Sequence, residues 1–473
     1  MPSRRAVIIG ALAASASFRP PAQAQNSPAG VPGSNAAPRT ILQLQRRSIK
    51  VNGKPASVFG IRQQDGTSGI TTDISKPFRV RVENRTAEPS LIHWHGLTPP
   101  WRQDGVPEIS GPAIPAGGSA DYDFPLRRGG SYWMHSHYGL QEQVLLSAPL
   151  IIKDGSEKPD QQEIVLMLAD FSFTPPDQIF AGLQSRRTHA MDMQGMRMPA
   201  MASKPDLNDV QYDAFLANSR TLADPEVVKV NRGGSVRLRI INGSSMSNYH
   251  IDLGQLEGDL IAVDGQRVQP VRGRNFPITS AQRLDIELSI PKNAAAHPVL
   301  AVLEGERRQT GIVLLAGQGH VRRISGLAHA ESPPLTLDLE RSLRAAEPLV
   351  DRKADRTHLV NLTESMQGYQ WSINNVAWTK DVPPLMVSEG ERVELVITNQ
   401  TMMSHPMHLH GHSFQVVAID GNRFAGALRD TVLVPPKTIV IVAFDADNPG
   451  WWAFHCHLLY HQHAGMFQTV HYE

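Results

Sequence analysis

Apolar and polar residues alternate in many short stretches of the chain from Thr40 onward. Three examples are FRVRVENRT (residues 78–86), SVRLRIING (235–243) and ERVELVITNQT (391–401). Alternation with a period of two places the apolar side chains on one face of a β-strand, and the asparagine near the end of each stretch is typical of a turn. The pattern therefore predicts an all-β protein.

The three stretches also share a common shape and an even spacing. Each follows a Gly or Pro turn, and consecutive stretches begin about 155 residues apart, which indicates three copies of one β-sandwich unit. With the polar connector at 155–163 as a guide, we expect domains at 39–154, 160–327 and 340–473. No long segment shows a helical period, so we expect helices to be short and few.

The N-terminus resembles an export signal over residues 1–24. Arg4 and Arg5 precede a short apolar run, and Ala22 to Ala24 offer a small-residue cleavage site. The paired arginines resemble a twin-arginine signal, although a leader with a chance arginine pair is the alternative. The apolar run is too short to be a permanent membrane anchor. We therefore expect a periplasmic protein in an oxidising compartment.

Composition limits the range of partners. The chain has 473 residues, too many for one compact core, and its 46 lysines and arginines nearly balance 45 acidic residues. This balance gives no reason to expect a nucleic acid or an acidic partner. The 37 glycines and 35 prolines are scattered through the chain, as in a β protein with many turns.

The histidines and the single cysteine are the strongest chemical signal. Most of the 19 histidines fall in four clusters, HWHG, HSH, HPMHLHGH and HCHLLYH, and Cys456 lies inside the last. Two clusters lie near the start of the chain and two near its end. Their side chains meet only if the first and last domains pack together.

The spacing within these clusters predicts where the side chains point. In a strand, residues i and i+2 share a face, so each H-x-H pair directs two imidazoles the same way, and the Cys456 thiol points opposite to His455 and His457. One thiolate, two imidazoles and a distant thioether match an electron-transfer copper site. Zinc prefers a closed tetrahedral set and gives no reason for the other histidines.

With these motifs, the chain resembles a three-domain multicopper oxidase of the laccase-like family, and within it the bacterial copper-resistance oxidases. The resemblance implies three cupredoxin-like Greek-key β-sandwich domains and four copper ions per chain: one type 1, one type 2 and two type 3. The implied type 2 ligands are His93 and His408. The implied type 3 ligands are His95, His135, His137, His410, His455 and His457. The implied type 1 ligands are His405, Cys456, His461 and Met466.

Four further residues near these motifs also receive predictions. Asp104 matches the family acid that helps deliver protons to oxygen, and its alternative interpretation is a plain Asp-Gly turn. Gln462 stands where some bacterial members carry a proton-relaying glutamate, so that relay is absent or runs elsewhere. We expect His412 to lie outside the metal sites, either as a packing residue or as a residue that supports a metal ligand, and His463 to be exposed.

The predicted activity is oxidation of Cu(I) or of phenolic and aromatic donors, with reduction of molecular oxygen to water. Cys456, His461 and Asp104 are the predicted catalytic residues, with the edge of the His461 imidazole exposed to the donor. A copper-sequestering protein with incidental oxidase activity is the alternative, and a copper nitrite reductase is a third idea. We expect a monomer.

A methionine-rich segment, HAMDMQGMRMPAM (189–201), fits no sandwich strand. The interleaved polar residues argue against a buried core segment, so we expect an inserted loop in the second domain. Because thioethers are soft ligands that favour Cu(I), this loop is hypothesised to capture Cu(I) above the type 1 site.

Overall fold

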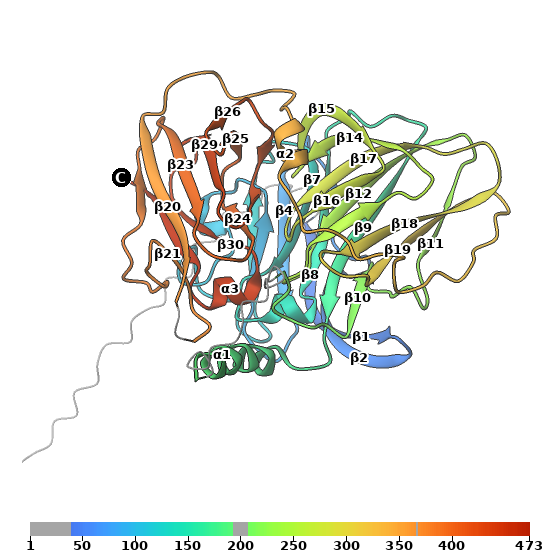
Figure 1. The fold of residues 1–473 in the computed structure, drawn as a ribbon, viewed down its shortest axis with the longest axis horizontal. Helices are drawn as coiled ribbons and strands as arrows, with labels where there is room; N and C mark the ends of the chain where they lie inside the picture. Colours follow the sequence, from blue (N-terminus) through green and yellow to red (C-terminus); the bar gives the residue numbers. More distant parts are fainter. Residues whose placement is uncertain (1–38, 193–206, 366–367) are drawn as a thin grey trace, which may run out of the picture. The chain divides into compact units, whose positions relative to one another are not determined.

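β-Strands make up most of the regular structure, as the alternating pattern predicts (Figure 1). The structure is a computed structural model that describes residues 39–192, 207–365 and 368–473. The strands form six sheets, which come in three pairs, and each pair is built from one continuous part of the chain. The all-β prediction is confirmed.

The first pair of sheets uses strands between Thr40 and Lys153. One sheet has the order β2-β1-β4-β6, with β1 (Thr40–Val51), β2 (Lys54–Gln63), β4 (Phe78–Asn84) and β6 (Ser119–Phe124). The other has the order β3-β8-β7-β5, with β3 (Ile70–Asp73), β5 (Ile92–His95), β7 (Gly130–Ser136) and β8 (Ser147–Lys153). Two 3₁₀ turns, η1 (Trp101–Gln103) and η2 (Gln141–Val144), lie in the connections.

The second pair uses strands between Gln161 and Ala316. One sheet has the order β10-β9-β12-β17-β14-β15, with β9 (Gln161–Phe171), β10 (Ala214–Ala217), β12 (Ser235–Asn242), β14 (Gly258–Val263), β15 (Gln266–Gly273) and β17 (Arg283–Ser289). The other has the order β11-β19-β18-β13-β16, with β11 (Val227–Val230), β13 (Tyr249–Asp252), β16 (Asn275–Ile278), β18 (Ala295–Leu303) and β19 (Gln309–Ala316). The helix α2 (Asp338–Ser342) follows.

The third pair completes the chain. One sheet has the order β21-β20-β23-β29-β25-β26, with β27 pairing with β25; its strands are β20 (Arg356–Glu364), β21 (Trp371–Ile373), β23 (Arg392–Asn399), β25 (Phe414–Ile419), β26 (Asn422–Arg423), β27 (Leu428–Arg429) and β29 (Ile439–Asp445). The other has the order β22-β31-β30-β24-β28, with β22 (Leu385–Val387), β24 (His405–Leu409), β28 (Thr431–Val434), β30 (Trp451–Cys456) and β31 (Phe467–Tyr472).

The three stretches singled out by their alternation occupy equivalent places. They form β4, β12 and β23, and each pairs in parallel with the first strand of its own part of the chain: β1, β9 and β20. Each also pairs antiparallel with a later strand, β6, β17 or β29. The repeated unit predicted from the sequence is therefore present three times.

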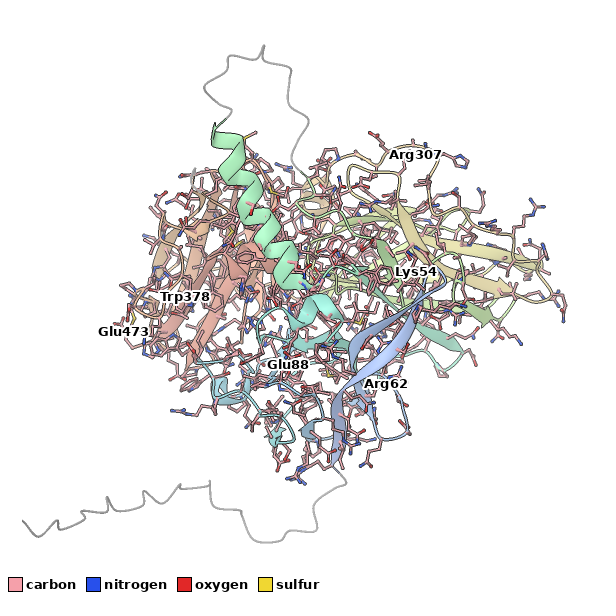
Figure 2. All side chains as sticks on the ribbon, turned by 90° about the horizontal axis from the view of Figure 1, so that it is seen from below. Lys54, Arg62, Glu88, Arg307, Trp378 and Glu473 are labelled. Atoms are coloured by element: carbon pink, nitrogen blue, oxygen red, sulfur yellow. The ribbon has the colours of Figure 1, made fainter. Side chains whose placement is uncertain are left out.

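Helix α1 (Pro176–Asp192) departs from the prediction of short helices only, because it has 17 residues. Leu183 joins the core, and Ile179 and Phe180 pack against it. These residues make only a narrow apolar stripe at its N-terminal half, so the helical period is weak in the sequence. Figure 2 shows the helix in front of the sheets, from the side opposite to the one on which it packs. Residues 189–192 of the methionine-rich segment belong to α1 rather than to a loop, and 193–201 lie outside the described residues.

No helix among the described residues is long and apolar enough to cross a membrane.

A buried arginine joins the three pairs of sheets. Arg283 opens β17, is fully buried, and donates through Nη1 to Asp430 Oδ1 (2.8 Å) and through Nε to the carbonyl of Ser131 (3.1 Å). Asp430 lies between β27 and β28, and Ser131 lies in β7. One side chain of the second pair therefore holds parts of the first and third pairs together.

Replacing this arginine is expected to destabilise the protein strongly. Arg283→Met leaves the Asp430 carboxylate buried without its cation, which costs about 3–5 kcal/mol of the free energy of unfolding. Chemical denaturation of the copper-free protein measures the loss. The control is Arg272→Met, because Arg272 forms an exposed pair with Glu257. Equal stability of the two variants would contradict the joining role of Arg283.

Candidate metal centre

The first candidate site surrounds Cys456, at the end of β30. Its Sγ lies 3.6 Å from Nδ1 of His405 and 3.9 Å from Nδ1 of His461, and the two Nδ1 atoms are 3.2 Å apart. All three side chains are fully buried. The backbone N–H of Cys456 donates to the carbonyl of Met466 (3.1 Å), whose side chain is also fully buried. The side chains of His405, Cys456 and His461 are thus brought together, and Met466 is joined to Cys456 through the backbone; we call these four residues the thiolate cluster.

Local structure explains this convergence. Strand β24, which begins at His405, pairs antiparallel with β30, which ends at Cys456. The short helix α3 (Leu459–His463) then turns the chain back and carries His461 over the thiol. Burial raises the pKa of the Cys456 thiol. A bound cation reverses this effect, because a thiol that coordinates a metal is deprotonated.

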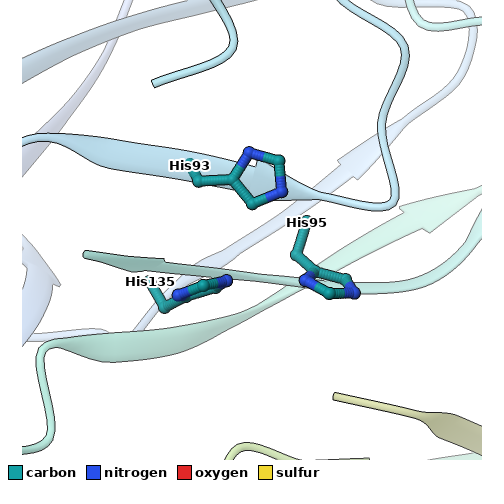
Figure 3. Close-up of side chains that lie close together, drawn as sticks. All are labelled: His93, His95 and His135. Carbon is teal, nitrogen blue, oxygen red and sulfur yellow. The ribbon is translucent and has the colours of Figure 1, made fainter. Parts of the chain in front are cut away.

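The second candidate site contains eight histidines, which we call the histidine cluster; seven are buried, and His137 is half-buried. His93 and His95 lie in β5, His135 lies in β7, His408 lies in β24 and His455 lies in β30. The residue that directly follows each of the last three strands also belongs to the cluster: His137, His410 and His457. Figure 3 shows His93 and His95 on one strand and His135 on the strand beside it. The expected packing of the first and last parts of the chain is confirmed.

We group the rings of this cluster by their facing nitrogens into two triangles and a pair: Nε2 of His135 lies 3.4 Å from Nε2 of His457, and Nε2 of His410 lies 3.0 Å from Nε2 of His455. In one triangle, the ring centroids of His95, His135 and His457 are 5.0–5.6 Å apart. In the other, those of His137, His410 and His455 are 5.0–5.1 Å apart. The remaining pair is His93 and His408, whose Nε2 atoms are 3.5 Å apart. The sequence alone did not divide the six type 3 candidates in this way.

The imidazoles of the cluster are suited to binding cations. Burial, together with neighbouring imidazoles, lowers the pKa of His95, His135, His137, His408 and His410 well below the ordinary value. Burial also lowers the pKa of His455 to about 4. These rings are therefore neutral near pH 7, and each has a nitrogen lone pair available for a metal.

Asp104 lies directly behind two of these rings. It is 1% exposed, and its Oδ2 accepts a hydrogen bond from Nδ1 of His410 (2.8 Å), while Nδ1 of His93 donates to its backbone carbonyl (2.9 Å). A plain exposed Asp-Gly turn does not describe this position. The structure places the predicted acid in contact with the histidine cluster.

Two other carboxylates behind the cluster were missed by the sequence analysis. Asp430 Oδ1 lies 3.1 Å from Nε2 of His95, and Glu142 Oε2 lies 2.7 Å from Nδ1 of His135. Burial, with the nearby Asp170, raises the pKa of Glu142 well above its ordinary value. Glu142 follows HSH by only five residues, which was a usable signal. Asp430 carries no such signal, since no histidine motif adjoins it.

Gln462 occupies a place beside the cluster, as its position next to His461 suggested. Its side-chain amide lies 3.3 Å from Nδ1 of His137. His412 is buried and bonded to the carbonyl of His410 and to the Tyr472 hydroxyl, which agrees with a packing role. His463 is exposed, as predicted.

The predicted exposure of His461 is wrong. The ring is fully buried, and its Nε2 lies 2.8 Å from Oδ2 of Asp209. Trp371 stacks on the ring with centroids 3.9 Å apart, and the Tyr369 hydroxyl also bonds to Asp209. The sequence missed this cover because Asp209 is 252 residues from His461.

A single stretch of backbone joins the two clusters. Cys456 faces His405 and His461, whereas its neighbours His455 and His457 each belong to a different triangle of the histidine cluster. The predicted alternation around Cys456 is therefore present. One peptide bond of the chain separates Cys456 from a member of each triangle.

The donors present fit copper. The buried Nδ1 of His95 and Nε2 of His137 have no hydrogen-bond partner among the described residues, as expected of atoms that bind a metal. A thiolate with two imidazoles and a thioether suits copper in electron transfer. In most of the other rings, the nitrogen that faces away from the cluster has a hydrogen-bond partner, which orients the ring for a metal.

Comparisons with known proteins agree with this chemistry. Models of the multicopper oxidase family match residues 43–157, 162–312 and 351–473. The multicopper oxidase MmcO of Mycobacterium tuberculosis is 30% identical over 85% of this chain and 81% of its own length. Copper resistance protein A of Pseudomonas syringae pv. tomato is 27% identical over 92% of this chain and 91% of its own.

Solved structures agree on the fold. The multicopper oxidase Fet3p matches with a TM-score of 0.77 at 20% identity, over 92% of this chain and 90% of its own. A multicopper oxidase from Pseudomonas thermotolerans matches with a TM-score of 0.69 at 22% identity, over 92% and 98%. The cupredoxin-like sandwich fold is confirmed. With three family models covering most of its length, the chain belongs to the multicopper oxidase family.

Proposed function

We propose that this oxidase takes single electrons from Cu(I) or from small phenolic and aromatic donors and reduces molecular oxygen to two waters. The observation that supports this most is the position of Cys456 between the thiolate cluster and both triangles of the histidine cluster. A protein that only sequesters copper has no use for such a link. The relative named copper resistance protein A supports a role in copper tolerance.

The proposed ligands follow the clusters. His405, Cys456, His461 and Met466 would hold the type 1 copper, and His93 and His408 the type 2 copper. One type 3 copper would lie within the triangle of His95, His135 and His457. The other would lie within the triangle of His137, His410 and His455. When bound, these ions supply four one-electron carriers, which matches the four electrons that oxygen takes up.

The chain's own residues have distinct tasks in this scheme. Electrons would enter at Asp209 and His461, because the Asp209 carboxylate lies against Nε2 at the edge of the His461 ring. Cys456 leads from this entry to the histidine cluster. Asp104 holds the His410 ring in place and is the group proposed to pass protons to the site of oxygen reduction.

The place of action and the division of the chain are also proposals. An export signal at 1–24, of the twin-arginine type, would send the protein to the periplasm, although those residues lie outside the described part. The proposed domain boundaries are 39–154, 160–327 and 340–473. They agree in outline with the three family-model matches, and we propose that the protein is a monomer.

The test of the proposed function is oxygen uptake with Cu(I) and with a simple phenol, measured side by side, together with the copper content per chain. We expect four coppers and steady oxygen consumption with at least one of the two donors. Full copper loading without oxygen consumption from either donor would favour the sequestering alternative and overturn the proposal.

The electron entry gives a separate prediction. Asp209→Asn removes the charge beside Nε2 of His461, and a hydrogen bond to a charged group contributes about 1.5–3 kcal/mol. We expect donor oxidation to slow about tenfold or more, seen as slower anaerobic bleaching of the blue colour. Reoxidation by oxygen should not change. The control is Asp177→Asn, an exposed acid on α1. An equal effect of both changes would show that only the surface charge matters.

A further inference from the structure

A third carboxylate lies against the histidine cluster besides Asp104 and Asp430. Glu142 belongs to η2 (Gln141–Val144), is 4% exposed, and has Oε2 2.7 Å from Nδ1 of His135. No arginine or lysine pairs with it among the described ion pairs. Burying an acidic side chain without a cation is costly, so packing alone does not explain this residue.

The turn that carries Glu142 is held firmly. The side chain of Gln141 accepts hydrogen bonds from the hydroxyls of Ser90 and Ser136 (both 2.8 Å) and donates to the carbonyl of Pro89 (2.9 Å). Leu145, just after the turn, adopts a left-handed conformation with φ of 63°. The position of the carboxylate is therefore set by the backbone and not by a free surface loop.

The geometry of His135 defines what Glu142 does. Nε2 of His135 points into the cluster, 3.4 Å from Nε2 of His457, while Nδ1 points at Glu142, which is nearer than the Ser136 carbonyl at 3.3 Å. A neutral imidazole carries one N–H. When Nδ1–H donates to the carboxylate, the lone pair of Nε2 is free for a metal.

The other rings of the cluster show why this contact matters. In the second triangle, Asp104 already accepts from Nδ1 of His410. In the first triangle, the Ser280 hydroxyl lies 3.5 Å from Nδ1 of His457, and no carboxylate of the described ion pairs contacts that ring. His95 meets Asp430, whose carboxylate is shared with Arg283. Glu142 therefore accepts a hydrogen bond from His135 in the first triangle, just as Asp104 accepts one from His410 in the second.

We propose that Glu142 is a positioning residue of the oxygen-reducing centre, which fixes His135 in the tautomer that binds the first type 3 copper. This inference rests on the proposed ligand role of His135. Gln462 cannot take the role, since it lies beside His137 in the other triangle.

The experiment compares Glu142→Leu and Glu142→Gln with the wild type. Leucine has similar size but no acceptor, whereas glutamine keeps a carbonyl acceptor at the same length. The control is Glu304→Gln, another buried glutamate, which bonds to Asn248 away from the histidine cluster. Each protein is titrated with copper and then examined by copper analysis, electron paramagnetic resonance and oxygen uptake.

We expect Glu142→Leu to bind its last copper about 10- to 100-fold more weakly, the usual effect of losing such a partner. The fraction of copper detected by paramagnetic resonance should rise, since a coupled type 3 pair is silent and a broken pair is not. Glu142→Gln should recover most of the copper and the silence of the pair, and Glu304→Gln should match the wild type in both.

Two results would overturn the positioning role: a folded Glu142→Leu protein with wild-type copper affinity and resonance, or a Glu142→Gln protein as defective as the leucine variant. Should the leucine variant fail to fold, Glu142→Asp replaces it, because a side chain shorter by one methylene withdraws the acceptor from His135. A wild-type protein that takes up no coupled copper pair would instead contradict the proposed function.

Discussion

Cys456→Ser is expected to give a colourless, inactive protein that keeps its fold. The blue colour of a type 1 copper arises from charge transfer between the thiolate and the metal, and serine supplies no thiolate. The eight residues of the histidine cluster are unchanged, so the other three coppers should still bind. Absorption spectra, copper analysis and oxygen uptake with Cu(I) or a phenol measure the three effects.

The neighbouring helix provides the control for this substitution. His463 is exposed on α3 and contacts Phe180 rather than either cluster, so His463→Ala should remain blue and active. A Cys456→Ser protein that stays blue would show that another residue supplies the charge transfer, and the proposed type 1 site would have to be abandoned.

Asp104→Asn is expected to slow the reduction of oxygen about 10- to 100-fold while leaving electron entry nearly intact. Asparagine is the same size, but it removes the charge that accepts from His410 and the group proposed to pass protons to oxygen. Asp104 contacts two rings of the histidine cluster, those of His93 and His410, whereas the proposed electron entry lies at the thiolate cluster. Anaerobic bleaching by a donor and recolouring by oxygen, followed separately by stopped flow, measure the two half-reactions.

The control for Asp104 is a second buried aspartate. Asp285 is equally buried at 1% exposure and bonds to Arg237 and Arg239, away from the histidines. Asp285→Asn should lower stability without changing the ratio of the two half-reactions. If Asp104→Asn slows bleaching and recolouring equally, Asp104 supports the structure and does not serve oxygen reduction in particular.

Features that depend on near neighbours in the chain were predictable. Alternation gave the strands, because side chains of a strand take opposite faces in turn, and β4, β12 and β23 were found by this rule alone. The same rule placed Cys456 opposite to His455 and His457. Helix α1 was not predicted, since its apolar stripe is short.

The sequence by itself determined which atoms are available for copper, because the thiol, the thioether and the imidazoles lie in short motifs whose spacing sets their direction. Only the tertiary structure decided how the six type 3 candidates divide into two triangles and which carboxylates stand behind them. Those partners come from distant parts of the chain: Asp104 lies 306 residues from His410, and Asp209 lies 252 from His461. Local patterns carry no information about such pairs, because the packing of whole sheets brings them together. For the same reason, the burial of His461 could be seen only in the folded chain.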